Sequence, residues 1–328
     1  MHRRALLAAG FSAAALAACG PEPDSATPGR TRIRFATDWL AQAEQGGFFQ
    51  AVAEDEYARR GLDVEIVPGG PGVNVPQLLA SGAVELGMGS NSFIVLNLAA
   101  EAVPVKAVAA FMQKDPQVLI AHPSPAVRSI ADLKGRPILL SDASVTAFWV
   151  WLKAKYGFTD DQVRKYTFNS APFLADPRAV QQGYLTSEPY TLRQAAGFDP
   201  AVFLLADEGY PGYAAMVLAP DRLLAEKPDA VRAFNAASAA GWTSYLNGDP
   251  GPGDALILKA NPEMRPDVLA QARDKMKANA IVGAGPAVGA MTDDRWREFF
   301  QVASSQGVYP ATLDYKRAYS LDFLPAQA

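Results

Sequence analysis

The residues best suited to chemistry are an acid and a large aromatic side by side, Asp38 and Trp39, at the end of a short strand-like pattern over residues 32–36. A helical pattern follows from Gly46. In open α/β sheets, ligands bind in the crevice at the carboxyl ends of strands. We therefore expect Asp38 and Trp39 to form one wall of a ligand-binding cleft. A core tryptophan beside a helix-capping aspartate would give the same pattern, so that interpretation stays open.

A second acid and aromatic, Glu188 and Tyr190, flank a proline at the start of another helical pattern. We expect this pair to face the first from a different lobe. A carboxylate that accepts a hydrogen bond from a ring amine contributes about 1.5–3 kcal/mol, and ring stacking adds about 0.5–1.5 kcal/mol. Together the two pairs suit a planar heteroaromatic ligand. Glu188 as a helix-start acid and Tyr190 as a core aromatic are the alternatives.

Small polar residues at other expected helix starts suit a different ligand. An anion prefers helix N-terminal N–H groups and hydroxyls, which Ser90, Asn91 and Ser141 would supply, while Gly70 would allow close approach of the backbone. The alternative for the three polar residues is that they only cap their helices.

Composition narrows the function class. A chain of 328 residues suits two domains of ordinary size. The formal net charge is −4, and no Lys/Arg cluster lies outside the extreme N-terminus, which argues against nucleic-acid binding. One cysteine and two histidines exclude a disulfide within the chain and zinc sites built from several such ligands. We expect no metal and no cofactor.

The N-terminus has the form of an export signal. Positive residues 1–4 precede an apolar run, residues 5–18, that is too short to span a bilayer comfortably. The run ends in Leu16-Ala17-Ala18-Cys19, which resembles a bacterial lipobox. We expect a signal peptide over residues 1–18, a lipidated Cys19 and a flexible tether over residues 19–30. A chance cysteine near another cleavage site and twin-arginine export through residues 3–4 remain alternatives.

Strand and helix patterns alternate after the tether, which predicts an α/β fold with a largely parallel sheet. The expected strands are residues 33–36, 62–67, 84–88, 104–111, 117–121, 138–140, 166–168, 183–187, 202–205 and 214–218. The expected helices are residues 46–59, 73–81, 129–137, 145–156, 176–182, 228–247, 254–260, 266–278 and 293–305, with further helices after residue 91 and from residue 189. The chain is therefore mainly helical after residue 220.

The order of motifs resembles that of substrate-binding proteins of ABC importers, in the group that handles nitrate, sulfonates, taurine and thiamine pyrimidine precursors. The motifs are the lipobox, Thr37-Asp38-Trp39, Ala131-Asp132-Leu133-Lys134-Gly135 and Thr186-Ser187-Glu188-Pro189-Tyr190. The resemblance covers nearly the whole mature chain. It implies a two-lobe periplasmic-binding-protein fold with two hinge crossings, lobe 1 being residues 31–121 plus 218–328 and lobe 2 residues 122–217, and closure around the ligand.

Asp38 and Trp39 resemble the pyrimidine-precursor branch of this group, where a histidine is expected at the position that Gln45 occupies here. The resemblance thus implies a monomeric, lipid-anchored periplasmic protein that binds a small heteroaromatic ligand and delivers it to an ABC permease in the inner membrane. The alternatives are a binding protein for an alkyl sulfonate, taurine or nitrate, an extracytoplasmic sensor domain, and a pyrimidine-synthesising enzyme of the same fold. Those enzymes use a cysteine-rich motif and pyridoxal phosphate, and this chain has one cysteine.

Overall fold

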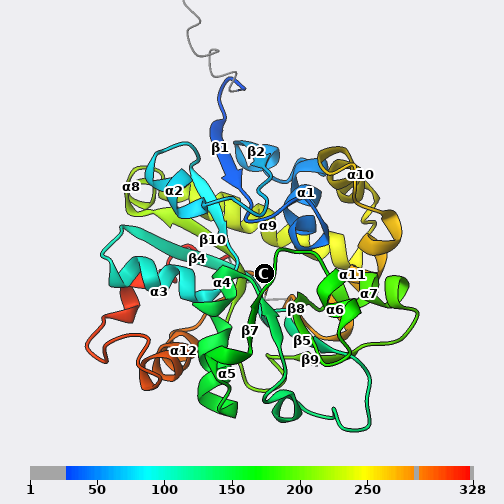
Figure 1. Cartoon of the computed structure of the whole chain (residues 1–328). Coiled ribbons are helices and arrows are strands. Elements are labelled where there is room, and N and C mark those ends of the chain that lie inside the picture. The colour runs from blue at the N-terminus through cyan, green and yellow to red at the C-terminus, as the bar shows by residue number, and fades with distance from the viewer. Residues whose placement is uncertain (1–26, 284–287, 326–328) are drawn as a thin grey trace, which may run out of the picture.

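The structure is a computed structural model that describes residues 27–283 and 288–325. The expected signal peptide, Cys19 and most of the expected tether lie outside the described residues. Two five-stranded sheets, each flanked by helices, make up the chain (Figure 1). Within the described part, no helix is long and apolar enough to cross a membrane.

The first sheet has the strand order β2-β1-β3-β10-β4. Strand β1 runs parallel to β2 and β3, whereas β10 lies antiparallel between β3 and β4. The strands are β1 (Thr31–Ala36), β2 (Leu62–Val67), β3 (Leu86–Gly89), β4 (Val105–Met112) and β10 (Ala214–Pro220).

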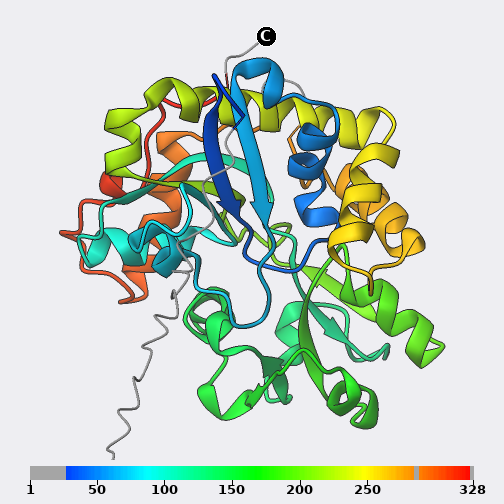
Figure 2. The same ribbon diagram turned by 90° about the horizontal axis from the view of Figure 1, so that it is seen from above.

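The second sheet has the order β7-β6-β8-β5-β9 and lies below the first in the view of Figure 2. Its strands are β5 (Gln117–Ala121), β6 (Ile138–Leu140), β7 (Val163–Lys165), β8 (Val180–Tyr184) and β9 (Ala201–Leu204). The chain passes between the sheets twice, after β4 and after β9. This is the predicted α/β fold with two lobes and two crossings. The expectation of a largely parallel sheet was wrong, because β10 and β5, the strands next to the crossings, each run antiparallel to both of their neighbours.

The expected lobe boundaries need correction. Strand β5, expected in lobe 1, pairs with β8 and β9 in the second sheet, and β10 enters the first sheet at Ala214 rather than at residue 218. Strands β4 and β5 are equally apolar, so hydrophobicity could not assign them to different sheets. The first crossing is the polar break Gln113–Pro116 between them.

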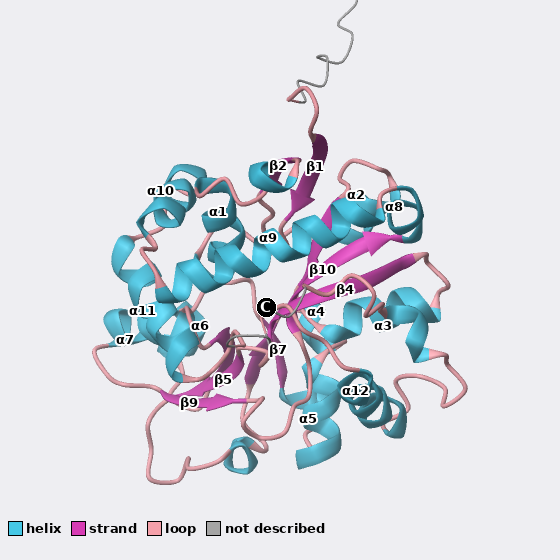
Figure 3. Cartoon of the chain, turned by 180° about the vertical axis from the view of Figure 1, so that it is seen from behind, coloured by secondary structure: helices cyan, strands magenta, loops and turns pink. Residues whose placement is uncertain are grey.

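Helices cover the faces of both sheets and dominate the C-terminal part (Figure 3). Helices α9, α11 and α12 have the predicted bounds. The helices of the described residues are α1 (Gly46–Ala53), α2 (Val75–Ala80), α3 (Ser92–Ala100), α4 (Asp142–Val145), α5 (Phe148–Tyr156), α6 (Ala171–Ala175), α7 (Glu188–Ala196), α8 (Asp221–Glu226), α9 (Pro228–Asn247), α10 (Gly251–Ala260), α11 (Pro266–Ala278) and α12 (Asp293–Ser305). Short 3-10 turns include η1 (Ala43–Gln45) and η2 (Ala58–Arg60).

Between residues 160 and 187 the predicted elements were placed a few residues too late in the sequence. The strands are β7 and β8 rather than residues 166–168 and 183–187, and the helix is α6 rather than residues 176–182. These elements are three to five residues long, too short for hydrophobic periodicity to fix their ends. Phe168, expected in a strand, has a left-handed backbone with φ +61°.

The glycines at the start of α1 are explained by its packing on α9. A Cβ atom on Gly47 would lie 2.1 Å from the ring of Trp242, and one on Gly241 would lie 2.2 Å from the Gly47 carbonyl oxygen. Only glycine allows this approach. The two helices then enclose an aromatic core in which the ring of Phe48 lies 5.9 Å from that of Trp242.

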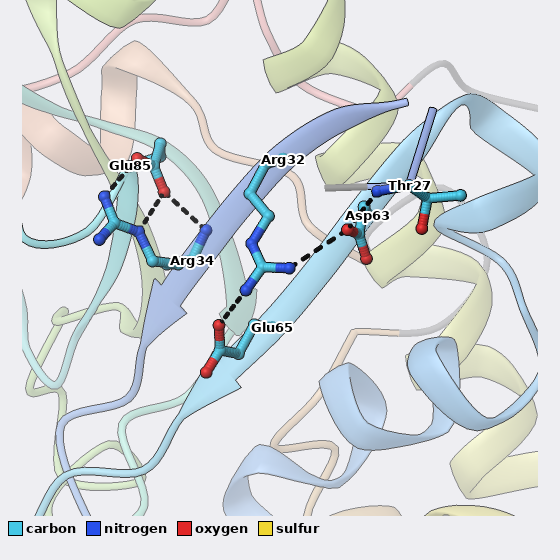
Figure 4. A network of polar contacts seen from close by, with 6 residues as sticks. All are labelled: Thr27, Arg32, Arg34, Asp63, Glu65 and Glu85. Atoms are coloured by element: carbon cyan, nitrogen blue, oxygen red, sulfur yellow. Dashed lines mark hydrogen bonds and ion pairs between the residues drawn. The ribbon is translucent and has the colours of Figure 1, made fainter. Parts of the chain in front are cut away.

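Strand β1 also makes an outward-facing set of ion pairs that fixes its position against both neighbours (Figure 4). Arg32 pairs with Asp63 at 3.2 Å and with Glu65 at 2.6 Å, both on β2, and Arg34 pairs with Glu85 at 2.8 Å, just before β3. Such partly exposed pairs contribute about 0–1 kcal/mol each. They join β1 to both of its neighbours in the sheet over its first four residues.

Candidate functional site

A cavity of about 790 Å³ lies between the two sheets. Its lining comes from both lobes and from both crossings. Eight of the predicted site residues contribute to it: Asp38, Trp39, Gln45, Gly70, Ser90, Asn91, Ser141 and Glu188. Tyr190 is not part of the lining.

The first-sheet wall begins at a tight turn after β1. The Thr37 hydroxyl donates to the Trp39 carbonyl oxygen at 2.8 Å, and the Gly69 N–H donates to the same carbonyl at 3.0 Å. A Cβ on Gly69 would lie 2.3 Å from the Thr37 carbonyl oxygen, so this contact requires glycine. The turn holds Asp38 and Trp39 at the carboxyl end of β1, where the sequence placed them.

Trp39 meets an aromatic side chain from the opposite lobe. Its ring centroid lies 4.6 Å from that of Phe168, with the planes tilted by 52°. Phe168 is 43% exposed and also lines the cavity. Its left-handed backbone costs about 1–2 kcal/mol for a residue other than glycine, and such strain concentrates at functional sites. Sequence reasoning missed Phe168, because nothing in the sequence signals its backbone conformation.

Asp38 carries an uncompensated polar atom. Among the described residues, no hydrogen-bond partner contacts its Oδ1. Burial raises the pKa of Asp38 to about 7, and the nearby Glu44 carboxyl adds to the rise while hydrogen bonds, including one from Gln45, oppose it. A buried acceptor without a partner suits a ligand that brings a donor.

Glu44 joins the two lobes next to Asp38. The Thr186 hydroxyl, just before α7, donates to Glu44 Oε1, and the Gln271 amide of α11 donates to the Thr186 carbonyl oxygen. Burial raises the pKa of Glu44. Glu44 was not among the predicted site residues, although its neighbour Gln45 was.

Glu188 begins α7 and faces the cavity. Its Oε2 accepts a hydrogen bond from the Tyr184 N–H at 2.8 Å. Burial raises the pKa of Glu188 to about 7; the bond from Tyr184 opposes the shift and Glu44 adds to it. Glu188 is therefore both a helix-start acid, as the alternative held, and part of the lining.

The expectation that Tyr190 presents its ring to the ligand does not agree with its position. Its hydroxyl donates to Asp267 Oδ2 of α11 at 2.8 Å, and Gln194 Nε2 lies 3.4 Å from the same oxygen. Tyr190 lies two residues after Glu188 on α7, so its side chain points to nearly the opposite side of the helix. Tyr190 thus joins α7 to α11 at the rim, outside the cavity.

The predicted capping residues both cap helices and line the cavity. Asn91 Oδ1 accepts from the Phe93 N–H at 3.0 Å, and Ser141 Oγ accepts from the Ser144 N–H at 3.3 Å. The Ser141 N–H donates to Gln182 Oε1 at 2.6 Å, which places that amide in the lining. Capping a helix and lining the cavity are therefore compatible here.

Two further lining residues come from the crossings. Asp115 is 3% exposed, and its Oδ1 accepts from the Gln117 N–H at 3.0 Å. Burial raises the pKa of Asp115 to about 7, although Arg295 lowers it. Tyr210 is 2% exposed, and its hydroxyl has no partner among the described residues. The polar break before Pro116 was the available sequence signal for Asp115.

The lining has a strong excess of acidic groups. Its acids are Asp38, Glu44, Asp115, Asp142 and Glu188, and among the described residues its one Lys or Arg is Lys165. The Lys165 side chain is 67% exposed and lies 3.0 Å from Asp142 at the rim. In the described ranges, no three His, Cys, Asp or Glu residues are arranged to hold a metal ion.

Comparisons with known proteins agree with this architecture. Residues 42–250 match the NMT1/THI5-like family. The riboflavin-binding protein RibY of Chloroflexus aurantiacus is 26% identical, over 95% of this chain and 91% of that protein. The aliphatic sulphonate binding protein SsuA of Escherichia coli superposes with a TM-score of 0.68 at 15% identity, covering 92% of this chain and 94% of that one. SsuA of Xanthomonas axonopodis pv. citri, bound to MOPS, gives 0.66 at 13% identity, covering 89% and 99%.

Proposed function

Since the chain belongs to the NMT1/THI5-like family, we propose that it captures a flat heteroaromatic solute between its lobes and delivers it to an ABC permease. It is an ABC-type solute-binding protein, and proteins of this type bind small ligands and work with such a permease. The observation that carries the ligand class is the cavity, which combines aromatic rings from opposite lobes with buried acceptors.

The size of the cavity favours a ligand larger than one ring. Sites for drug-sized molecules have volumes of about 300–1,000 Å³, and 790 Å³ lies in the upper part of that range. A single pyrimidine ring would leave most of it to water. A flavin of the riboflavin type suits it better, and the name of the RibY relative supports the same choice. The thiamine pyrimidine precursor expected from Asp38 and Trp39 is the smaller candidate of the same chemical class.

The lining offers each part of such a ligand a partner. Trp39 and Phe168 supply faces for the ring system. The unpartnered Asp38 Oδ1 would accept from a ring N–H. Amides and hydroxyls elsewhere in the lining would bind a hydroxylated side chain, notably those of Asn74, Asn91, Ser90, Ser141, Ser144 and Gln182.

An anion such as an alkyl sulfonate, taurine or nitrate is the second candidate. The helix starts at Asn91 and Ser141, both in the lining, are the observation in its favour. The lining has five acids and only one lysine among the described residues, which disfavours an anion because like charges raise its free energy when it is bound. We rank it below a heteroaromatic solute for that reason.

Binding without catalysis is part of the proposal. The pyrimidine-synthesising enzymes of this fold, to which the sequence was compared above, use a cysteine-rich motif, and the single cysteine here is Cys19. We further propose that Cys19 is lipidated and anchors a monomeric protein to the membrane on the periplasmic side. Fractionation tests the anchor: Cys19→Ser should move the protein from the membrane fraction to the soluble fraction.

A thermal-shift screen of the mature chain tests the ligand class. A ligand that binds only the folded state raises its stability by RT ln(1 + [L]/Kd), about 2.7 kcal/mol at 100 Kd. Riboflavin, a hydroxymethyl aminopyrimidine, alkanesulfonates, taurine and polyamines are the probes. We expect a shift with riboflavin, a smaller one with the pyrimidine, and none with sulfonates. A shift with sulfonates alone would replace the proposal by the anion alternative.

A further inference from the structure

We propose that the buried carboxyl groups of this cleft act as a charge filter, so that the site takes uncharged or cationic heteroaromatic solutes and rejects their phosphorylated or sulfonated forms. The inference rests on the proposed function for the class of ring. It adds which members of that class the site accepts, and it names the residues that decide.

The filter residues come from four separate places in the chain. Asp38 follows β1, Glu44 lies in η1, Asp115 lies in the first crossing and Glu188 begins α7. Asp38, Glu44 and Glu188 line the same cavity, and the charge of Glu44 raises the pKa of the other two. Tyr184, also in the lining, is within reach of the charges of Asp38, Glu44 and Asp115. A solute in the cavity therefore meets acids from both lobes and from the first crossing.

Local partners of these carboxyls are neutral. Glu188 accepts from the Tyr184 N–H, Asp115 from the Gln117 N–H and Glu44 from the Thr186 hydroxyl. Neutral donors satisfy oxygen atoms but leave the negative charge uncompensated.

The cations nearby are engaged elsewhere. Lys165 is at the exposed rim, 3.0 Å from Asp142. Arg295 influences Asp115, but its guanidinium donates to the carbonyl oxygens of Pro211 and Gly212, each at 2.9 Å, and stacks 4.1 Å from the Tyr213 ring centroid. Arg295 is not part of the cavity lining. Within the described part of the lining, a phosphate or sulfonate group would thus meet acids and, apart from the rim Lys165, no Lys or Arg.

The filter should strengthen with pH. Burial raises the pKa of Asp38, Asp115 and Glu188 to about 7, so these groups are mostly neutral at pH 6 and mostly charged at pH 8. Tyr184 and Tyr210 have pKa values raised well above 10 and stay neutral over this range. A phosphate monoester also gains charge near pH 6, so a variant without the acids is needed to separate the two effects.

The test compares riboflavin with its 5′-phosphate, flavin mononucleotide, by fluorescence titration at pH 6 and pH 8. We expect the phosphate to bind on the order of a hundredfold more weakly at pH 8, with a smaller ratio at pH 6. The variant Asp38→Asn/Asp115→Asn/Glu188→Gln should reduce the ratio at pH 8 to less than about tenfold. The ratio is the readout, since each affinity alone also changes when lining residues are replaced.

A matched control removes three acids outside the lining, Glu101→Gln/Glu226→Gln/Glu263→Gln, all exposed. It should leave the ratio within about twofold of the original, because water and salt screen exposed charges that do not contact the solute. Equal affinity for the two flavins in the unmodified protein, or tighter binding of the phosphate, would overturn the filter while leaving flavin binding intact.

A second measurement decides the matter even if no flavin binds. Ser90→Cys in a Cys19→Ser background places one thiol in the lining. The readout is the rate of alkylation by anionic iodoacetate divided by the rate with neutral iodoacetamide. This ratio should be about tenfold lower than in the same protein with Asp38, Asp115 and Glu188 neutralised. An unchanged rate ratio would refute the filter. If riboflavin does not bind but the alkylation rate ratio changes as expected, only the proposed ligand is refuted.

Discussion

The two walls of the cleft are built in different ways. On the first-sheet wall, Asp38 and Trp39 sit on a turn fixed by backbone hydrogen bonds and by the close contact at Gly69. On the second-sheet wall, Phe168 has a left-handed backbone and Glu188 reaches the cavity from a helix start. The first wall depends on a close contact between two loops far apart in the sequence, and the second on the backbone conformation of Phe168 and on a local hydrogen bond at a helix start. We expect the first to be sensitive to packing beneath it and the second to tolerate change in its backbone.

The largest effect should follow a change beneath the first wall. Gly47→Ala would place a Cβ 2.1 Å from the Trp242 ring, where α1 crosses α9. Helix α1 begins directly after the lining residue Gln45. Overpacking of this kind costs about 1–3 kcal/mol, and we expect the upper end, measured as a lower midpoint in denaturant unfolding. Gly72→Ala is the control, because no atom lies within 4 Å of a Cβ there. Equal stability of the two variants would show that the helix crossing can relax.

Loss of the indole should affect binding more than folding. Trp39 is only partly buried, and its ring contacts Phe168 across the cleft. Trp39→Ala should weaken riboflavin binding by at least about tenfold, or about 1.4 kcal/mol, in a fluorescence titration. Its unliganded midpoint should stay within a few degrees of the original. A large loss of unliganded stability would instead support the core interpretation of Trp39.

A change at Phe168 on the second wall should lower ligand affinity without lowering the stability of the unliganded protein. Phe168→Gly removes the ring but relieves a left-handed backbone, which costs about 1–2 kcal/mol for other residues. Affinity should fall several-fold while the unliganded melting temperature holds or rises. Phe168→Asn, which tolerates the same backbone, should behave alike. A lower melting temperature in both variants would mean that the ring stabilises the fold more than the backbone strains it.

Both walls should contribute to a pH effect on the unliganded protein. Asp38 and Glu188 have pKa values raised by burial to about 7, above the unfolded values near 4. Stability that is present at pH 4 is therefore lost as pH rises toward 7 and then levels off. The melting temperature should be lower at pH 8 than at pH 5.5. Asp38→Asn/Glu188→Gln should reduce the difference, and Asp115 and Glu44, whose pKa values are also raised, should keep part of it. A slope unchanged in that variant would contradict the assignment.

The smallest effect is expected at the rim. Tyr190→Phe removes the 2.8 Å hydrogen bond to Asp267 between α7 and α11 while keeping the ring. An exposed polar contact of this kind is worth less than about 1 kcal/mol, so affinity should fall by about threefold or less with no change in ligand preference. A change in preference would return Tyr190 to the binding surface.

The contrast between the walls also explains what the sequence could predict. Asp38 and Trp39 follow a strand with clear alternation, and the long helices α9, α11 and α12 carry sustained periodicity, so both were found. Tyr190 was misplaced because it lies two residues after Glu188 on a helix, where side chains that far apart face different directions. Phe168 and Asp115 depend on the path between short elements, which local patterns do not determine.

Strand β10 has a consequence for the order in which the protein can fold. It is inserted between β3 and β4, although the whole second sheet precedes it in sequence. During synthesis, the edges of β3 and β4 that pair with β10 therefore stay unpaired until residues 214–220 have been made. Unpaired strand edges can associate with other chains. A protein shortened before residue 214 would lack the strand that joins its first sheet, so the N-terminal half should not fold alone.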